Sequence, residues 1–93
     1  MLRRLLAIRR CVPLDRSEEY DGLWSRVRAA VDEAGGHAWR FRSARRQDTY
    51  LEFIESRELD RVLEGRRVAA ARLDLDAVFG PGDPEAWEEA PVE

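Results

Sequence analysis

The strongest constraint on the fold is a helical stripe of apolar residues that ends at a pair of glycines. Asp15 or Ser17 can accept hydrogen bonds from the free amides of a first helical turn, and Gly35-Gly36 supplies a C-terminal stop. Between these signals, apolar residues recur every three or four positions, which is typical of one face of an amphipathic helix. The stripe consists of Tyr20, Leu23, Trp24, Val27, Ala30, Val31 and Ala34. A helix therefore crosses this region and needs an apolar surface to pack on.

Three stretches on either side of this helix have the short, apolar or alternating character of β-strands. Leu2–Val12 is rich in leucine, isoleucine and valine and ends at Pro13. His37–Ala44 and Thr49–Glu55 alternate between larger apolar and polar residues. The polar segment Arg45–Asp48 between the last two stretches is short enough for a hairpin turn, so we expect them to be antiparallel neighbours.

A second helical region follows the hairpin. Ser56-Arg57-Glu58 begins it, Gly65 marks a break, and residues 66–79 continue as helix until Gly80-Pro81-Gly82-Asp83-Pro84 ends it. The acidic tail around Trp87 fits a helical turn, a short fourth strand or a frayed end. We predict one domain over residues 1–80 and an acidic C-terminal tail over residues 81–93.

This order of elements predicts an α+β fold with a ferredoxin-like β-α-β-β-α core, an antiparallel sheet, helices on one face, and a possible short fourth strand in the tail. The sheet face expected under the helices carries Leu6, Ile8, Trp39, Phe41, Leu51 and Phe53. The opposite face is expected to carry Arg3, Arg9, Arg40, Arg42, Tyr50 and Glu52 around Leu5, Ala7, Ala38 and Ile54. That second face is too apolar for bare water and too charged for a dry core, so we expect a second subunit, a ligand or both to cover it.

Charged side chains on this second face suggest a binding site. Arg40, Arg42 and Glu52 belong to adjacent strands, and they can bind an anionic ligand with Tyr50 as a stacking or hydrogen-bonding wall. The competing interpretation is a cross-strand ion pair at a dimer interface. The predicted ligand-binding residues are Arg9, Arg40, Arg42, Tyr50 and Glu52.

Composition argues against nucleic acid and membranes as partners. The 19 acidic residues outnumber the 16 basic ones, all arginine, and give a net charge of −3. Arg46–Phe53 loosely resembles the third-strand motif of RNA-recognition domains, with Tyr50 as a stacking aromatic, but Asp48 and Glu52 count against it. No segment approaches the ~20 apolar residues of a membrane span.

Metal and cofactor chemistry also lacks a signature. His37 is the only histidine and has no second histidine or nearby cysteine to form a metal set, so a surface contact is the simpler interpretation. Cys11 is the only cysteine, which excludes an intrachain disulfide and fits a reducing compartment. The N-terminal apolar run Leu5–Ile8 is too short for an export signal. We predict a cytoplasmic protein with no cofactor and no metal.

The stretch Asp48–Leu63, DTYLEFIESRELDRVL, resembles the third strand and second helix of dimeric α/β-barrel proteins, nearest to the antibiotic biosynthesis monooxygenase-like group. The resemblance extends over about residues 2–63. It implies two ferredoxin-like subunits that pair their sheets into a barrel, with the open sheet face as the ligand cavity. The helix position at which members often carry a histidine is Val62 here.

Together these features predict a homodimer that binds a small molecule on the open sheet face, with or without oxygenase-like chemistry. The alternative is a non-catalytic interaction module that uses the same face for protein–protein contact. The two hypotheses differ in whether that face encloses a cavity or a well-packed interface of more than roughly 1,000 Å².

Overall fold

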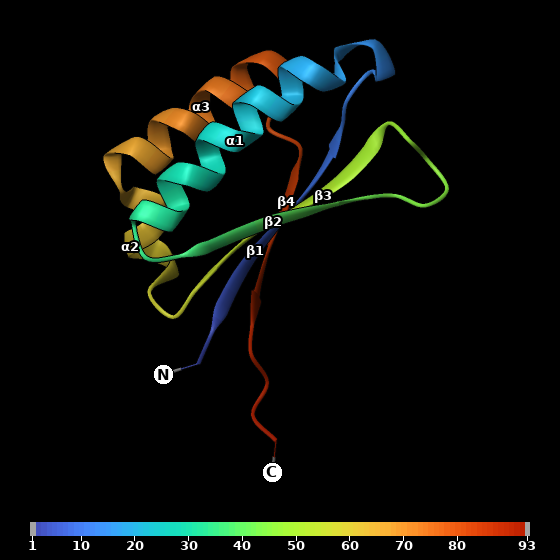
Figure 1. Cartoon of the computed structure of the whole chain (residues 1–93). Coiled ribbons are helices and arrows are strands. Elements are labelled where there is room, and N and C mark those ends of the chain that lie inside the picture. The colour runs from blue at the N-terminus through green and yellow to red at the C-terminus, as the bar shows by residue number, and fades with distance from the viewer. Residues whose placement is uncertain (1, 93) are drawn as a thin grey trace.

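The computed structural model describes residues 2–92 and shows helices on one side of a four-stranded antiparallel sheet (Figure 1). A 3₁₀ turn, Leu14–Arg16, precedes the first helix. The other elements are β1 (Arg4–Cys11), α1 (Ser17–Glu33), β2 (His37–Arg42), β3 (Thr49–Ser56), α2 (Leu59–Glu64), α3 (Arg66–Phe79) and β4 (Asp83–Glu88). The predicted α+β class, the antiparallel sheet and the single helix layer are confirmed. No helix within residues 2–92 is long and apolar enough to cross a membrane.

Helix α1 begins and ends where local chemistry allows. Gly35 has a φ of +88° and donates its amide to the Asp32 carbonyl at 3.1 Å, which ends the helix as predicted. The predicted side-chain cap from Asp15 or Ser17 is wrong, because Arg16 occupies the N-cap position and makes no side-chain capping bond. Instead, the 3₁₀ turn after Pro13 leads the backbone into the first turn of α1. Glu18 and Glu19 in that first turn interact favourably with the positive end of the helix dipole.

Helices α2 and α3 are separated at Gly65, as predicted. Gly65 has a ψ of 133°, which takes the backbone out of the helical region between the two segments. The apolar stripe of α1, apart from the exposed Ala34 after its end, shares one core with the sheet and with Val68, Ala71 and Leu75 of α3. On their outer surfaces Arg26 of α1 pairs with Asp74 of α3 at 2.8 Å.

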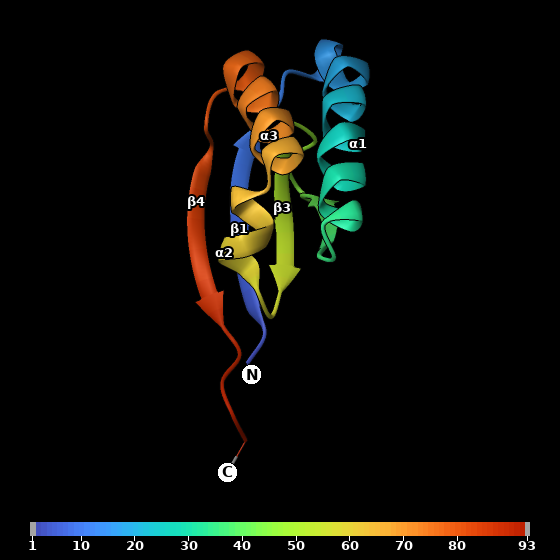
Figure 2. The ribbon, with the colours of Figure 1, turned by 90° about the vertical axis from the view of Figure 1, so that its left-hand side faces the viewer.

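The sheet order is β2-β3-β1-β4, so the tail forms an edge strand. Among the alternatives for the tail, the short fourth strand is therefore correct. Figure 2 shows β4 at one edge of the sheet, beside β1 and outside the helix layer. Gly82, with a φ of +65°, leads into this strand, and a Cβ there would lie 2.7 Å from the Arg9 carbonyl oxygen. Only glycine lets the chain pass this close to β1.

The assignment of residues to the two sheet faces differs from the prediction in β2 and β3. Leu6 and Ile8 do face the helices, but their cross-strand neighbours are Ile54 and Glu52, not the aromatic residues. The face under the helices carries Leu6, Ile8, Arg10, Ala38, Arg40, Tyr50, Glu52 and Ile54. Trp39, Phe41, Leu51 and Phe53 lie on the opposite side. Buried charges neutralise one another beneath the helices, which lets the aromatic side of these strands face outward.

Candidate functional site

The sheet face that turns away from the helices, called the open face below, is ordered into three cross-strand rows. The first row is His37, Glu55, Leu5 and Trp87; the second is Trp39, Phe53, Ala7 and Glu85; the third is Phe41, Leu51, Arg9 and Asp83. Each row runs from β2 through β3 and β1 to β4. The aromatic residues concentrate on β2 and β3, and the acidic residues on β4.

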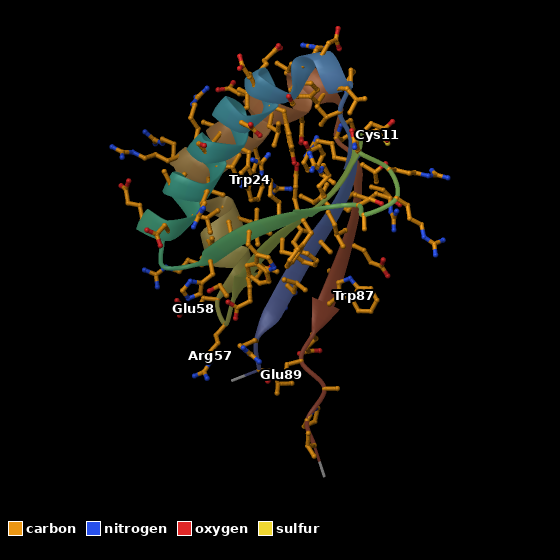
Figure 3. The ribbon with its side chains drawn as sticks, turned by 45° about the vertical axis from the view of Figure 1, so that its right-hand side comes forward. Cys11, Trp24, Arg57, Glu58, Trp87 and Glu89 are labelled. Carbon is orange, nitrogen blue, oxygen red and sulfur yellow. The ribbon has the colours of Figure 1, made fainter. Side chains whose placement is uncertain are left out.

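Large aromatic side chains on this face remain in contact with solvent. Trp39, Phe41 and Trp87 are 37%, 61% and 53% exposed. The Trp39 and Phe53 rings stack with centroids 5.2 Å apart, and Phe41 meets the edge of Phe53 at 5.9 Å. Trp87 projects from β4 away from the helix layer (Figure 3). Contiguous exposed aromatic surface of this kind marks an interaction site.

Two adjoining hollows lie on the open face. One, of about 260 Å³, has Leu5, Ala7 and Phe53 among its lining residues, together with Arg9 and Trp87. The other, of about 310 Å³, shares Leu5 and Trp87 and extends toward Trp39. Both hollows are open to solvent in a single copy of the chain. Apolar residues are the majority of the lining of the first hollow, whereas charged residues are the majority in the second, beside Leu5, Trp39 and Trp87.

A larger hollow of about 580 Å³ lies where the β2 and β3 ends approach the helices. His37 lines it, directly across the strands from Glu55, and Arg57 lies on its rim. An imidazole beside a carboxylate can exchange protons with a bound molecule. Within residues 2–92 no hydrogen bond orients His37, so the structure provides proximity without a fixed acid–base geometry.

The five predicted ligand-binding residues do not share one face. Arg9 is exposed on the open face, as predicted. Arg40, Arg42, Tyr50 and Glu52 lie on the helix side, so their predicted placement on the open face is wrong. No hollow that we observe is lined by these five residues together. A ligand-binding role stays a prediction for all five, and only Arg9 could exert it from the open face.

Glu52 is the centre of a buried polar cluster between the sheet and the helices. It accepts hydrogen bonds from Arg10 Nε at 2.8 Å and Nη2 at 3.1 Å, and from the Tyr20 hydroxyl at 2.7 Å. Arg10 also donates to Asp76 at 3.1 Å and to the Gly80 carbonyl. Four elements and the α3–β4 connection are thereby joined by one ion network.

The charges in this cluster keep the Tyr20 phenol and the Arg10 guanidinium protonated. Burial and the Glu52 carboxylate raise the pKa of the Tyr20 hydroxyl, so the phenol stays protonated. Burial alone would lower the pKa of Arg10, but Glu52 and Asp76 outweigh it and raise that pKa. Every charge is paired and none is free to act on a substrate, so we interpret the cluster as structural.

Arg40 joins this interior from β2. Its guanidinium lies 4.9 Å from the Tyr20 ring centroid and 5.6 Å from that of Tyr50, and it donates to Asp21 at 2.7 Å. Its Nη1 is buried and has no hydrogen-bond partner within residues 2–92. The two tyrosine rings, tilted by 57° to each other, offset part of that loss through cation–π attraction to the guanidinium.

Sequence reasoning missed two residues. It did not identify Arg10 as the ion-pair partner of Glu52, and it did not place Trp87 on the open face. Arg10 and Glu52 are 42 residues apart, and only the β1–β3 register brings them onto one side. Arg10 is two residues after Ile8, so strand alternation puts it on the same side as Leu6 and Ile8, and this was the available signal. Within residues 2–92 no group of three or more His, Cys, Asp or Glu side chains is arranged to hold a metal ion.

Solved structures give the decisive comparison for the fold. A protein from Nitrosomonas europaea named as a candidate antibiotic biosynthesis monooxygenase superposes with a TM-score of 0.72 at 12% identity, covering 97% of this chain and 90% of that one. The chain has the fold of antibiotic biosynthesis monooxygenase-like proteins. A similarly named protein from Bordetella bronchiseptica covers 100% of both chains at 16% identity and a TM-score of 0.68. SnoaB from Streptomyces nogalater, described as a cofactor-independent oxygenase, gives 0.72 at 14% identity, covering 98% and 94%.

The likeness to the antibiotic biosynthesis monooxygenase-like fold confirms the predicted resemblance at the level of architecture. No protein-family model and no curated protein sequence matches the chain. At these identities the shared fold does not by itself transfer an activity, because one fold hosts many functions. Function must therefore be argued from the open face.

Proposed function

We propose that this chain is a cytoplasmic, homodimeric small-molecule-binding protein whose ligand cavity lies between the open faces of two copies. The observation that carries the proposal is the aromatic cluster of Trp39, Phe41 and Phe53 on one side of the open face, with Trp87 on the opposite edge and the two hollows between them. A monomer would leave this surface in water, at a cost that burial against a second copy removes.

The dimensions of the open face support a second copy as its cover. Strands of six to eight residues, spaced ~4.8 Å apart, give a face of roughly 19 by 20–26 Å. The accessible area of such a ridged surface exceeds its projection, so two faces would bury on the order of 1,000 Å² in total. That value reaches the lower range for a specific protein interface.

The lining of the first hollow suits a planar aromatic ligand, and Arg9 offers one contact for an acidic group on it, in competition with Asp83 and Glu85 of the same hollow. Leu5, Ala7, Phe53 and Trp87 offer apolar contact, and Arg9 is the only arginine in the three rows of the open face. Arg9 forms no ion pair within residues 2–92. A guanidinium beside an apolar floor recognises a carboxylate on a planar ring.

Oxygenase-like chemistry is a further prediction that rests on the fold likeness to proteins named as monooxygenases. The open face contributes Arg9 and the His37–Glu55 neighbours as its polar groups. Oxygen uptake measured with a phenolic aromatic acid, in wild type and in His37→Ala, tests this step independently of binding.

An interaction module is the second candidate, because the same exposed aromatic surface suits a protein partner. In that case the two faces would pack without an internal cavity, and small aromatic acids would not bind the dimer. Ligand binding thus separates the two functions.

A thermal-shift titration with 1-hydroxy-2-naphthoic acid tests the proposal. The probe should raise the melting temperature of the dimer in a saturable way, since a ligand bound only by the native state stabilises it. Arg9→Gln should weaken binding at least about tenfold, the loss expected for one charged hydrogen bond. Arg28→Gln, an exposed arginine of α1, is the matched control and should bind like wild type. A dimer that shows no shift with this probe or its ring analogues would favour the interaction module.

A further inference from the structure

The outer edge of β2 has backbone groups that no neighbouring strand uses. In an antiparallel pair every second residue bonds to its neighbour, and the residues between direct their amides and carbonyls to the other side. The Ser43 amide donates to the Thr49 carbonyl at 2.8 Å, which fixes the alternation along β2. The residues of β2 that bond to β3 are then His37, Trp39 and Phe41. The residues whose backbone points outward are Ala38, Arg40 and Arg42.

The same alternation shows that the other edge strand, β4, is a poorer partner. The Glu89 amide donates to the Arg3 carbonyl at 2.9 Å, so the outward backbone of β4 belongs to Pro84, Ala86 and Glu88. Pro84 has no N–H to donate, which is one way in which proteins protect a sheet edge. Strand β2 contains neither proline nor glycine. Its outer edge therefore keeps all three of its donors and all three of its acceptors.

A hollow of about 350 Å³ adjoins this edge, between β2 and the flank of α1. It is lined by Ser25, Arg28, Ala29, Asp32, His37 and Ala38. Figure 2 shows α1 on the side of the sheet opposite β4. An extended chain beside β2 would therefore have a strand on one side and a helix flank within reach. Strand addition of this kind takes its affinity from backbone hydrogen bonds and its specificity from pockets for alternate side chains.

Unpaired charge around this edge is mainly positive. Four exposed arginines of α1, β2 and the hairpin form no ion pair within residues 2–92, namely Arg28, Arg42, Arg45 and Arg46. Against them stand two acids without an ion pair in the same range, Asp32 and Asp48. Arg40 and Asp21 pair with each other at 2.7 Å. The excess of free arginine suits a partner with acidic side chains.

Strand geometry also decides how the side chains of an added chain would alternate. A residue opposite Ala38, Arg40 or Arg42 would have its side chain on the helix side, because cross-strand neighbours share a face. Acidic side chains suit these positions. The residues between them would point to the open side, next to the exposed rings of Trp39 and Phe41. Apolar side chains suit those positions.

We propose that the outer edge of β2 binds an extended segment of another protein in which acidic and apolar residues alternate, and that this segment adds a fifth strand to the sheet. Backbone bonds to Ala38, Arg40 and Arg42 hold the segment, and the unpaired arginines select its acidic residues. The site lies at the edge of the sheet and not in the two hollows of the open face. The inference is therefore independent of the proposed small-molecule ligand.

Hydrogen exchange with a model peptide tests the proposal. The probe is an acetylated and amidated peptide of four Glu-Val repeats, titrated into the ¹⁵N-labelled chain. We expect saturable binding with a Kd below about 1 mM. The amides of Ala38, Arg40 and Arg42 should exchange at least about tenfold more slowly with the peptide bound, and those of Ala86 and Glu88 at an unchanged rate. Four Lys-Val repeats, and four glutamates followed by four valines, should bind at least about tenfold more weakly.

Variants separate the backbone contacts from the charge. Arg42→Gln should weaken binding of the Glu-Val peptide about threefold, and Arg42→Pro, which also removes an outward N–H, about fivefold more. Ala86→Pro makes the same backbone change on β4 and should bind like wild type. Arg28→Gln should weaken binding about threefold, whereas Arg66→Gln, an exposed arginine of α3, should have no effect. Circular dichroism establishes folding, and the glutamine variants together with the exchange data decide the matter if Arg42→Pro does not fold.

Three results would overturn the proposal. One is absence of binding up to about 1 mM peptide. Another is binding that leaves the exchange of the outward β2 amides unchanged, which would show that the peptide associates elsewhere. The third is slow exchange of these amides in the free chain at about 100 μM that becomes fast on dilution, since the occupant of the edge would then be a second copy of the chain.

Discussion

Replacing Glu52 with glutamine tests whether β3 faces the helices as described. The change keeps the shape of the side chain and removes its negative charge. Glu52 is 1% exposed and accepts three hydrogen bonds, two from Arg10 and one from Tyr20. Glutamine leaves the Arg10 guanidinium buried with only Asp76 and the Gly80 carbonyl to compensate it.

The expected loss is large relative to the total stability. Breaking a buried pair by removing one partner costs about 3–5 kcal/mol. Since Asp76 still pairs with Arg10 at 3.1 Å, we expect the lower end, about 3 kcal/mol. A domain of this length is stable by about 5–14 kcal/mol in total. Arg10→Met/Glu52→Leu removes both charges and should cost about 2 kcal/mol less than the sum of Arg10→Met and Glu52→Leu, each measured alone.

Urea unfolding at pH 7 and fixed protomer concentration measures these free energies. Glu55→Gln is the matched control on the same strand, because Glu55 faces the open side and accepts no hydrogen bond within residues 2–92. It should change stability by no more than about 0.5 kcal/mol. Equal small effects at Glu52 and Glu55, or strict additivity of Arg10 and Glu52, would refute the buried cluster and the face assignment.

Two further changes test the interior and the edge strand. Burial and Glu52 raise the pKa of Tyr20, so the phenol stays protonated in the folded chain. The unfolded chain loses this proton above about pH 10, so the stability that depends on the protonated phenol is present below about pH 10 and is lost above it. Melting temperatures should fall less between about pH 9 and about pH 11 in Tyr20→Phe than in wild type, and equal falls would contradict the raised pKa. Gly82→Ala places a Cβ 2.7 Å from the Arg9 carbonyl and should cost about 1–3 kcal/mol with faster hydrogen exchange along β4. Gly22→Ala, with nothing within 4 Å in α1, should instead stabilise by about 0.5–1 kcal/mol, and a similar loss at both glycines would refute the close β4 contact.

Local patterns in the sequence predicted most of the elements. The apolar stripe of α1, the stop at Gly35 and the break at Gly65 each depend on neighbouring residues, so sequence spacing was sufficient to find them. The order of elements then restricted the sheet to an antiparallel arrangement under one helix layer. Only the fate of the tail stayed open, because its apolar residues do not form a clear period around Trp87.

The sides of β2 and β3 were not predictable from each strand alone. Judged by hydrophobicity, Trp39 and Phe53 belong under the helices, and Glu52 belongs in water. The β1–β3 register instead pairs Ile8 with Glu52 and brings Arg10 beside it, so the charges satisfy each other. A pair 42 residues apart has no local signal. The result is a set of exposed aromatic side chains on the open face, which the proposed second copy would cover.

The mass in solution of a variant changed on the open face tests most directly whether a second copy covers that face. Phe41 on the open face and Leu73 on α3 are 61% and 68% exposed, so Phe41→Glu and Leu73→Glu are matched changes on opposite sides of the molecule. Sedimentation equilibrium of wild type and Leu73→Glu should give twice the chain mass of 10.8 kDa, and Phe41→Glu should give 10.8 kDa. A wild-type monomer, or a dimer lost in Leu73→Glu and kept in Phe41→Glu, would contradict the proposal that a second copy covers the open face.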